Sequence, residues 1–232
     1  MACLVALGVW QVHRRAYKLD LIARVEARVH AAPTPAPDPG RWTDISARAD
    51  EYRRVIARGD WLEDRSVFVL AVTKLGGGYW VMTPLARDDG TTALVNRGFV
   101  PADKRDPASW RPPDPRPVTV TGLLRMSEPG GALLRANDPG SGRWFSRDVA
   151  AIAASRGLAE VAPYFIDAER APGESGLPVA GLTVIAFSNN HLVYALTWGA
   201  LALMAAAGAV FVNLDRLRSG RVGPRQAGLH ES

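Results

Sequence analysis

The sequence predicts a membrane protein in which two transmembrane α-helices, the first one truncated, flank a mainly β (α+β) extracytoplasmic domain. Three observations predict this arrangement. Ser175 to Leu214 contains no Asp, Glu, Lys or Arg. Met1 to Trp10 is also apolar, but it is only ten residues long. Between these ends, short β-like runs alternate with Gly- and Pro-rich turn signals, which is the pattern of a small β domain.

The C-terminal apolar run predicts the second span, which we place at residues 189–214. Its centre, Leu192 to Val212, is 21 residues of almost unbroken apolar sequence, and a bilayer core about 30 Å thick needs about 20 such residues. Tyr194 and Trp198 lie near one end, where an aromatic belt is expected. Four arginines follow in the tail, residues 215–232. The positive-inside rule therefore predicts a cytoplasmic C-terminus.

The N-terminal apolar run predicts a first transmembrane helix at residues 1–12 whose first half is missing. Ten residues at about 1.5 Å each reach only about 15 Å. A buried or interfacial helix start is the alternative. Residues 13–40 are expected to be a helical extension that begins with a basic cluster, followed by a Pro-rich linker from Ala32 to Gly40. The basic cluster falls outside in a two-span topology, against the simple charge rule, which governs long translocated segments poorly.

Residues 41–188 are expected to be the β domain. Trp42 to Ala57 is ambiguous between helix and strand. Strands are predicted at Ser66–Thr73, Tyr79–Thr83, Thr92–Val95, Val118–Met126, Tyr164–Ile166 and Leu182–Phe187. Turns are predicted at Gly76–Gly78, Asp88–Gly90, Asn96–Gly98 and Pro107–Pro117, with a positive φ at Gly98. Arg147 to Arg156 is expected to be a short amphipathic helix capped by Gly157.

Composition and motifs exclude several classes of function. Cys3 is the single cysteine, so neither an intrachain disulfide nor a Cys-based zinc or iron–sulfur site can form. The net charge is +5, but no Lys/Arg run is long enough to follow a phosphate backbone. The chain lacks GxxxxGK[ST], GxGxxG, HExxH and GxSxG motifs. We therefore expect neither nucleic-acid binding nor catalysis.

His191 is the candidate ligand residue, because it stands at the outer mouth of the predicted second span. On a helix it shares a face with Tyr194, Ala195 and Trp198. Imidazole is a natural axial ligand of haem iron, and a small residue among aromatic rings leaves room for a flat macrocycle. The alternative is a polar interfacial residue beside an aromatic belt, capped by Asn190.

At the other end of the chain, Trp10 and Arg14 share a helix face, and Gln11 and Arg15 share the neighbouring one. An arginine on either face is suited to carboxylates such as haem propionates. An anchor of Trp and Arg at the lipid headgroups is the alternative interpretation.

An ordered set of motifs over nearly the whole chain resembles the Surfeit locus protein 1 family. The motifs are Leu7-Gly8-Val9-Trp10-Gln11 with Arg14-Arg15 and Lys18, Tyr79–Pro84, Leu94–Pro101, Val120–Arg125, Trp144-Phe145 with Asp148, and Asn189–Trp198. The truncated first span is a departure from the family pattern.

The resemblance implies a cytochrome c oxidase assembly factor, a non-enzymatic chaperone that binds haem a and assists its insertion into subunit I of the oxidase. It implies His191 as the ligand of the haem iron, and we expect Trp198, Tyr194, Arg14 and Trp10 to line the cofactor site. Subunit I and a haem a synthase are the expected partners, in a bacterial inner membrane. A scaffold for oxidase subunits that binds no haem is one alternative, and a membrane enzyme acting on haem is another.

Overall fold

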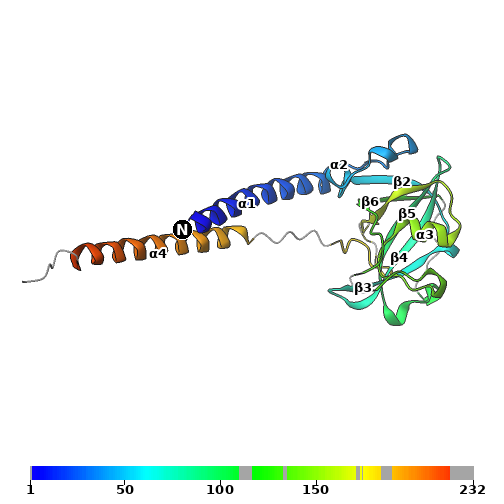
Figure 1. Ribbon diagram of the computed structural model, residues 1–232. Helices are drawn as coiled ribbons and strands as arrows, with labels where there is room; N and C mark the ends of the chain where they lie inside the picture. The colour runs from blue at the N-terminus through cyan, green and yellow to red at the C-terminus, as the bar shows by residue number, and fades with distance from the viewer. Residues whose placement is uncertain are drawn as a thin grey trace, which may run out of the picture. The chain divides into compact units, whose positions relative to one another are not determined.

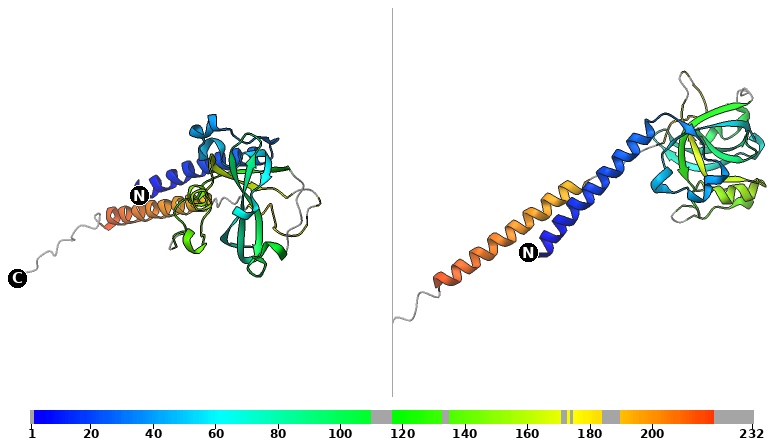
Figure 2. Two further views of the ribbon diagram at one scale, coloured as in Figure 1. Left: turned by 90° about the vertical axis from the view of Figure 1, so that its right-hand side faces the viewer. Right: turned by 90° about the horizontal axis from the view of Figure 1, so that it is seen from above.

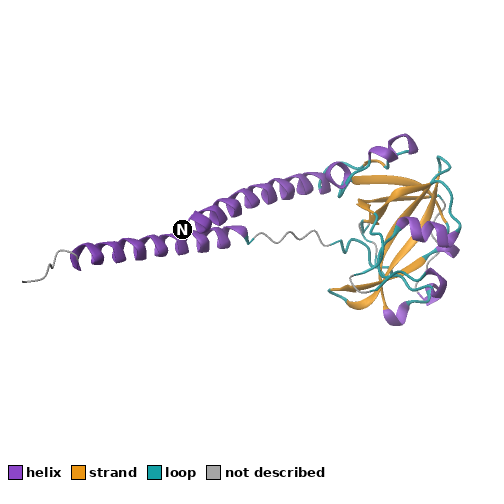
Figure 3. Cartoon of the chain, viewed as in Figure 1, coloured by secondary structure: helices purple, strands orange, loops and turns teal. Residues whose placement is uncertain are grey.

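A computed structural model describes residues 2–109, 117–132, 135–170, 173, 175–183 and 190–219. The chain divides into two compact units. One is helical and comprises Met1–Ala23 with Ala186–Ser232, and the other, Arg24–Ile185, contains all the described strands. Figures 1 and 3 show the two units as a helical part and a strand-rich part.

The β unit is built around a closed barrel (Figure 1). Its strands are β2 (Arg54–Trp61), β4 (Gly76–Arg87), β5 (Thr92–Pro101), β6 (Val118–Met126) and β7 (Val161–Ala168). The pairing runs β2, β6, β7, β5, β4 and back to β2, where Gly59 to Trp61 pair with Leu85 to Arg87. β5 and β7 are parallel, and the other barrel pairs are antiparallel. Closure removes the free strand edges that an open sheet would leave. β1 (Thr34–Pro35) pairs with β2, and β3 (Val67–Thr73) pairs with β4.

Two apolar clusters occupy opposite faces of this sheet. Val95, Leu124 and Ile166 belong to one cluster, whereas their neighbours Leu94 and Phe165 belong to the other. The outer cluster lies under α3 (Val149–Arg156), which contributes Val149 and Ile152 to it. Because both faces of the sheet are covered, β5 is buried at nearly every position instead of at alternate ones.

The predicted helix at Arg147–Arg156 is confirmed as α3, which begins two residues later. The Asp148 carboxylate accepts from the Ala151 backbone N–H at the N-terminus, and Gly157 ends the helix with φ 60°. The ambiguous segment Trp42–Ala57 contains both kinds of element. The 3₁₀ helix η1 (Pro39–Asp44) and α2 (Ala47–Asp50) precede β2.

The glycine-rich turn predictions require two corrections. Gly76–Gly78 belongs to β4 and pairs with Ala71 to Thr73, and the hairpin turns one step earlier, at Lys74-Leu75. A Cβ at Gly78 would lie 2.6 Å from the Phe99 ring, so glycine is needed here for close packing. Asn96–Gly98 lies inside β5 and is not a turn. The positive φ at Gly98 is confirmed, at 131°.

Most of the remaining strand and turn predictions were right in kind, and several predicted strands were too short. Val118–Met126 is β6 to the residue, and the strands predicted at Tyr79–Thr83, Thr92–Val95 and Tyr164–Ile166 extend further as β4, β5 and β7. The turn at Asp88–Gly90 is confirmed. Residues 182 and 183 are not in a strand, and the rest of the predicted strand 182–187 lies outside the described residues. Most of the predicted turn 107–117 lies outside them too, apart from the 3₁₀ helix η4 (Pro107–Ser109).

The helical unit consists of α4 (His191–Ser219) and the N-terminal part of α1 (Ala2–Val29). The beginning of α1 and the first part of α4 lie side by side in the views of Figures 1 and 2. α1 is one continuous helix, which confirms that the charged segment after residue 12 prolongs the first helix. Within the described residues, one stretch is long and apolar enough to cross a membrane, His191–Leu214. The two-span topology is therefore not confirmed, because charged residues interrupt α1 soon after its apolar start.

Candidate functional site

His191 is the first residue of α4, and its imidazole meets a polar partner on α1. The ring nitrogen Nδ1 lies 2.7 Å from Oε1 of Gln11. Gln11 is a polar residue in a mostly apolar helix segment, and its side chain is only 8% exposed. A buried amide without a partner is costly, so the contact with His191 satisfies Gln11 and fixes the imidazole at the same time.

This contact determines which ring nitrogen is available for other chemistry. An amide oxygen only accepts hydrogen bonds, so Nδ1 of His191 donates to it. The lone pair of the neutral ring then lies on Nε2. A hydrogen bond to the distal ring nitrogen is the usual way in which a protein orients a metal-binding histidine. His191 and Gln11 together therefore present an oriented nitrogen donor.

Small and aromatic residues lie in the turns of α4 that follow His191. A Cβ at Gly8 would lie 3.9 Å from both the Ala195 carbonyl oxygen and the Trp198 Cβ, which places Trp198 against α1. Tyr194, on the same side of α4, is 53% exposed. An apolar groove of about 540 Å³ runs between the helices and is lined by Leu4, Val5, Gly8, Val9, Val12, His13, Ala195, Gly199, Ala202, Leu203 and Ala206. The groove is of the size that holds small ligands.

The structure does not bring Trp10 and Arg14 to this donor. Two residues along an α-helix turn by about 200°, so Trp10 faces away from Gly8 and its α4 contacts. Trp10 is 54% exposed. The Arg14 guanidinium lies 5.4 Å from the centre of the Tyr17 ring, and both side chains are exposed. Arg15, which is half-buried, lies one turn after Gln11 and shares its face.

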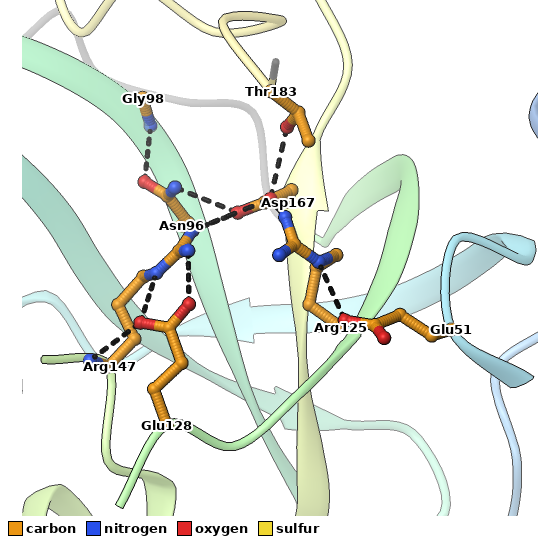
Figure 4. Close-up of polar contacts among 8 residues, drawn as sticks. All are labelled: Glu51, Asn96, Gly98, Arg125, Glu128, Arg147, Asp167 and Thr183. Atoms are coloured by element: carbon orange, nitrogen blue, oxygen red, sulfur yellow. Dashed lines mark hydrogen bonds and ion pairs between the residues drawn. The ribbon is translucent and has the colours of Figure 1, made fainter. Parts of the chain in front are cut away.

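A second polar cluster, which we call the Asp167 cluster, lies in the β unit (Figure 4). Asp167 on β7 is 3% exposed and accepts hydrogen bonds from four residues. They come from Asn96 on β5 (2.8 Å), Arg125 on β6 (2.9 Å), Arg147 (3.2 Å) and Thr183 (3.0 Å). The cluster ties three barrel strands to the segment that leads toward α4.

Two further carboxylates extend the Asp167 cluster, as Figure 4 shows: Glu51 beside Arg125 and Glu128 beside Arg147. Burial alone would raise the pKa of the Glu128 carboxyl, but the hydrogen bonds and charge of Arg147 outweigh burial and hold that pKa below its ordinary value. A polar cavity of about 290 Å³ adjoins the cluster. Each arginine already has carboxylate partners, so the arrangement is suited to holding strands together.

Sequence reasoning missed both Gln11 as the partner of His191 and the Asp167 cluster. Gln11 has one local signal, a lone amide inside an apolar run. The members of the cluster come from separate strands, so no spacing in the sequence indicates them. Among the described residues, no group of three or more His, Cys, Asp or Glu side chains is arranged to hold a metal ion.

Comparisons with known proteins agree with the resemblance drawn from the motifs. The model of the SURF1 family matches residues 1–203. Surfeit locus protein 1 of Homo sapiens is 35% identical over 215 residues, which cover 84% of this chain and 69% of that protein. The Rattus norvegicus protein of the same name is 34% identical over 210 residues, with coverage of 83% and 66%. A SURF1-like protein of Monosiga brevicollis is 32% identical over 228 residues, with coverage of 89% and 82%. The chain thus spans just under two thirds of the length of the rat relative.

Proposed function

The chain belongs to the SURF1 family, and from this premise we propose that it is an assembly factor for cytochrome c oxidase. In this proposal it is not an enzyme. It binds haem a and assists its insertion into subunit I of the oxidase. The observation that supports haem binding is the hydrogen bond between His191 and Gln11, because it leaves Nε2 of the imidazole available as an axial ligand.

The residues around His191 fit a haem as cargo. The groove between α1 and α4 has apolar walls. Small residues, Ala195, Gly199, Ala202 and Ala206, form most of its α4 side, together with Leu203. Trp198 offers an indole on the same face of α4, about two turns after His191. The contacts in the helical unit favour Arg15 over Arg14 as the propionate partner. Arg15 shares the face of Gln11, whereas Arg14 shares the face of Trp10, which is turned away from α4. Tyr194 then serves at the edge of the site, and Trp10, which faces away from α4, is not part of it.

The test is the Soret band of the full chain, purified after co-expression with a haem a synthase. His191→Ala should abolish or strongly shift the band, and Gln11→Leu should shift it less, because the ligand remains but loses its orienting bond. His191→Met should keep some binding with an altered potential, since a thioether also serves as an axial ligand. Arg15→Ala should weaken binding more than Arg14→Ala.

His30→Ala is the matched control, since His30 lies in the β unit as an exposed partner of Glu26. Membrane insertion should be the same in all variants, because the apolar run that follows His191 is intact. A wild-type band that is unchanged in His191→Ala would refute the ligand assignment.

The second candidate is a scaffold that binds oxidase subunits without haem, and one surface favours it. The β3–β4 hairpin exposes Leu70, Val72 and Leu75, with Val72 87% exposed. Exposed apolar side chains of this kind mark interaction surfaces. In either proposal the hairpin is the contact for subunit I or a haem a synthase. Wild-type protein that purifies without haem and still co-purifies with subunit I would favour the scaffold.

We also propose a bacterial inner membrane as the location, with the β unit outside and the C-terminus in the cytoplasm. The apolar stretch of α4 and the arginines that follow it support this orientation.

A further inference from the structure

A separate cavity of about 660 Å³ lies in the β unit, between the β3–β4 hairpin and residues 135–145. We call it the arginine–aromatic cavity. Its lining includes four aromatic side chains, Phe68, Tyr79, Trp144 and Phe145, and three arginines, Arg105, Arg135 and Arg143. Its volume lies within the range of about 300–1,000 Å³ typical of small-molecule sites. Neither the Asp167 cluster nor any residue of the helical unit contributes to it.

The cavity places guanidinium groups on aromatic faces. The Arg105 guanidinium lies 4.9 Å from the Tyr79 ring centre and 5.7 Å from that of Phe68. The Arg135 guanidinium lies 5.5 Å from the Phe145 ring centre. Stacking leaves the N–H edges of a guanidinium free, because the ring occupies only its face. Both cations can therefore still donate to a ligand.

The charges in the cavity are unevenly compensated. Arg143 donates to Asp138 at 2.9 Å, and hydrogen bonds from Ser141 and Arg143 lower the pKa of Asp138 to about 2. Within the described part of the chain, neither Arg105 nor Arg135 has a carboxylate partner. Among the described lining residues, three arginines therefore face one carboxylate, an excess of two positive charges that an anionic ligand would neutralise.

The wall that carries Phe145 is held in place by hydrogen bonds. The side-chain oxygen of Asn137 accepts from the backbone N–H groups of Phe145 (2.8 Å) and Ser146 (3.1 Å). The backbone N–H of Leu70 on β3 donates to the Trp144 carbonyl at 2.8 Å. A wall that is already fixed loses little conformational entropy on binding, which favours affinity.

We infer that the arginine–aromatic cavity binds a planar, apolar molecule that carries carboxylate groups. Guanidinium edges match carboxylates in a bidentate geometry, and the aromatic rings offer stacking surfaces to a flat body. The lining contains no His, Cys or Met, so the ligand is held by its carboxylates and its rings. This inference does not rest on haem binding at His191, and the two can fail separately.

The probe is naphthalene-2,6-dicarboxylate, titrated by calorimetry into the full chain in detergent. It should bind one molecule per chain. Its uncharged diamide and succinate, which has the charge without the rings, should each bind at least about tenfold more weakly. Arg105→Gln and Arg135→Gln should each weaken the dicarboxylate at least about tenfold. Both side chains are exposed, so these variants should fold.

Arg58→Gln is the control, because Arg58 is an exposed arginine outside the cavity, paired with Asp88. It should bind the probe like wild type. The inference is overturned if wild type does not bind at millimolar probe, if succinate binds as well as the dicarboxylate, or if the Arg105 and Arg135 variants bind like wild type.

Discussion

Replacing Asp167 by Asn tests whether the Asp167 cluster stabilises the barrel. The substitution keeps the shape of the side chain but removes its charge and half of its acceptor capacity. Arg125 and Arg147 lose their shared partner, which is 3% exposed. The bond from Asn96 or the bond from Thr183 is lost as well, because the new amide nitrogen cannot accept.

The expected cost follows from these contacts. Breaking a buried ion pair from one side typically costs about 3–5 kcal/mol, since the remaining charge is left buried. Each arginine here keeps a second carboxylate, Glu51 for Arg125 and Glu128 for Arg147. We therefore expect the lower end of that range, about 3 kcal/mol. That corresponds to an increase of roughly 100-fold in the equilibrium constant for opening of the paired barrel strands.

Hydrogen–deuterium exchange of the full chain in detergent measures this opening, read at the amides of β6 and β7 where they pair. The matched control is Asp88→Asn, which breaks an exposed 3.6 Å contact with Arg58 and should change stability by less than about 1 kcal/mol. Equal exchange in the two variants would refute the reasoning, because the buried cluster would then contribute no more than a surface pair.

Three further predictions concern the backbone, pH and orientation. Gly98→Ala should destabilise the barrel by about 2–4 kcal/mol in chemical denaturation, because φ is 131° and a Cβ would lie 2.4 Å from the Val179 carbonyl carbon; wild-type stability would contradict the close approach. The lowered pKa of Glu128 means that its contribution to stability is present above its ordinary pKa of 4.5 and is lost as pH falls below that value. Glu128→Gln should therefore reduce the loss of unfolding free energy as the pH falls below this value. An unaltered pH dependence of stability would exclude this carboxylate as its cause. A periplasm-dependent reporter should be active in the β3–β4 turn at Leu75 and inactive after Ser232, and the opposite pattern would reverse the proposed topology.

Local patterns in the sequence were sufficient for much of the secondary structure. Val118–Met126 alternates as a strand does, the capping pair Asp148 and Gly157 brackets a helix, and His191–Leu214 has the length and hydropathy of a span. These features depend on neighbours within a few residues. They could therefore be predicted without knowing the fold.

Glycines were harder to interpret from sequence, because they serve both turns and close packing. Gly76–Gly78 was predicted as a turn, but Gly78 makes room for Phe99 from the adjacent strand. At Gly98 the prediction of a positive φ was right and the prediction of a turn was wrong. Gly98 lies within a strand, and the backbone of Val179, which is distant in the sequence, packs closely against it.

The sequence by itself determined the family, through its ordered motifs, and the candidate ligand His191. Only the tertiary structure decided what surrounds that ligand. It paired His191 with Gln11, which is 180 positions away in the chain. It also turned Trp10 and Arg14 away from the face of α1 that contacts α4. It also gathered Asn96, Arg125 and Arg147 around Asp167. The physical reason is that helix rotation and strand register set which distant side chains meet, and neither is encoded in the local spacing of residues.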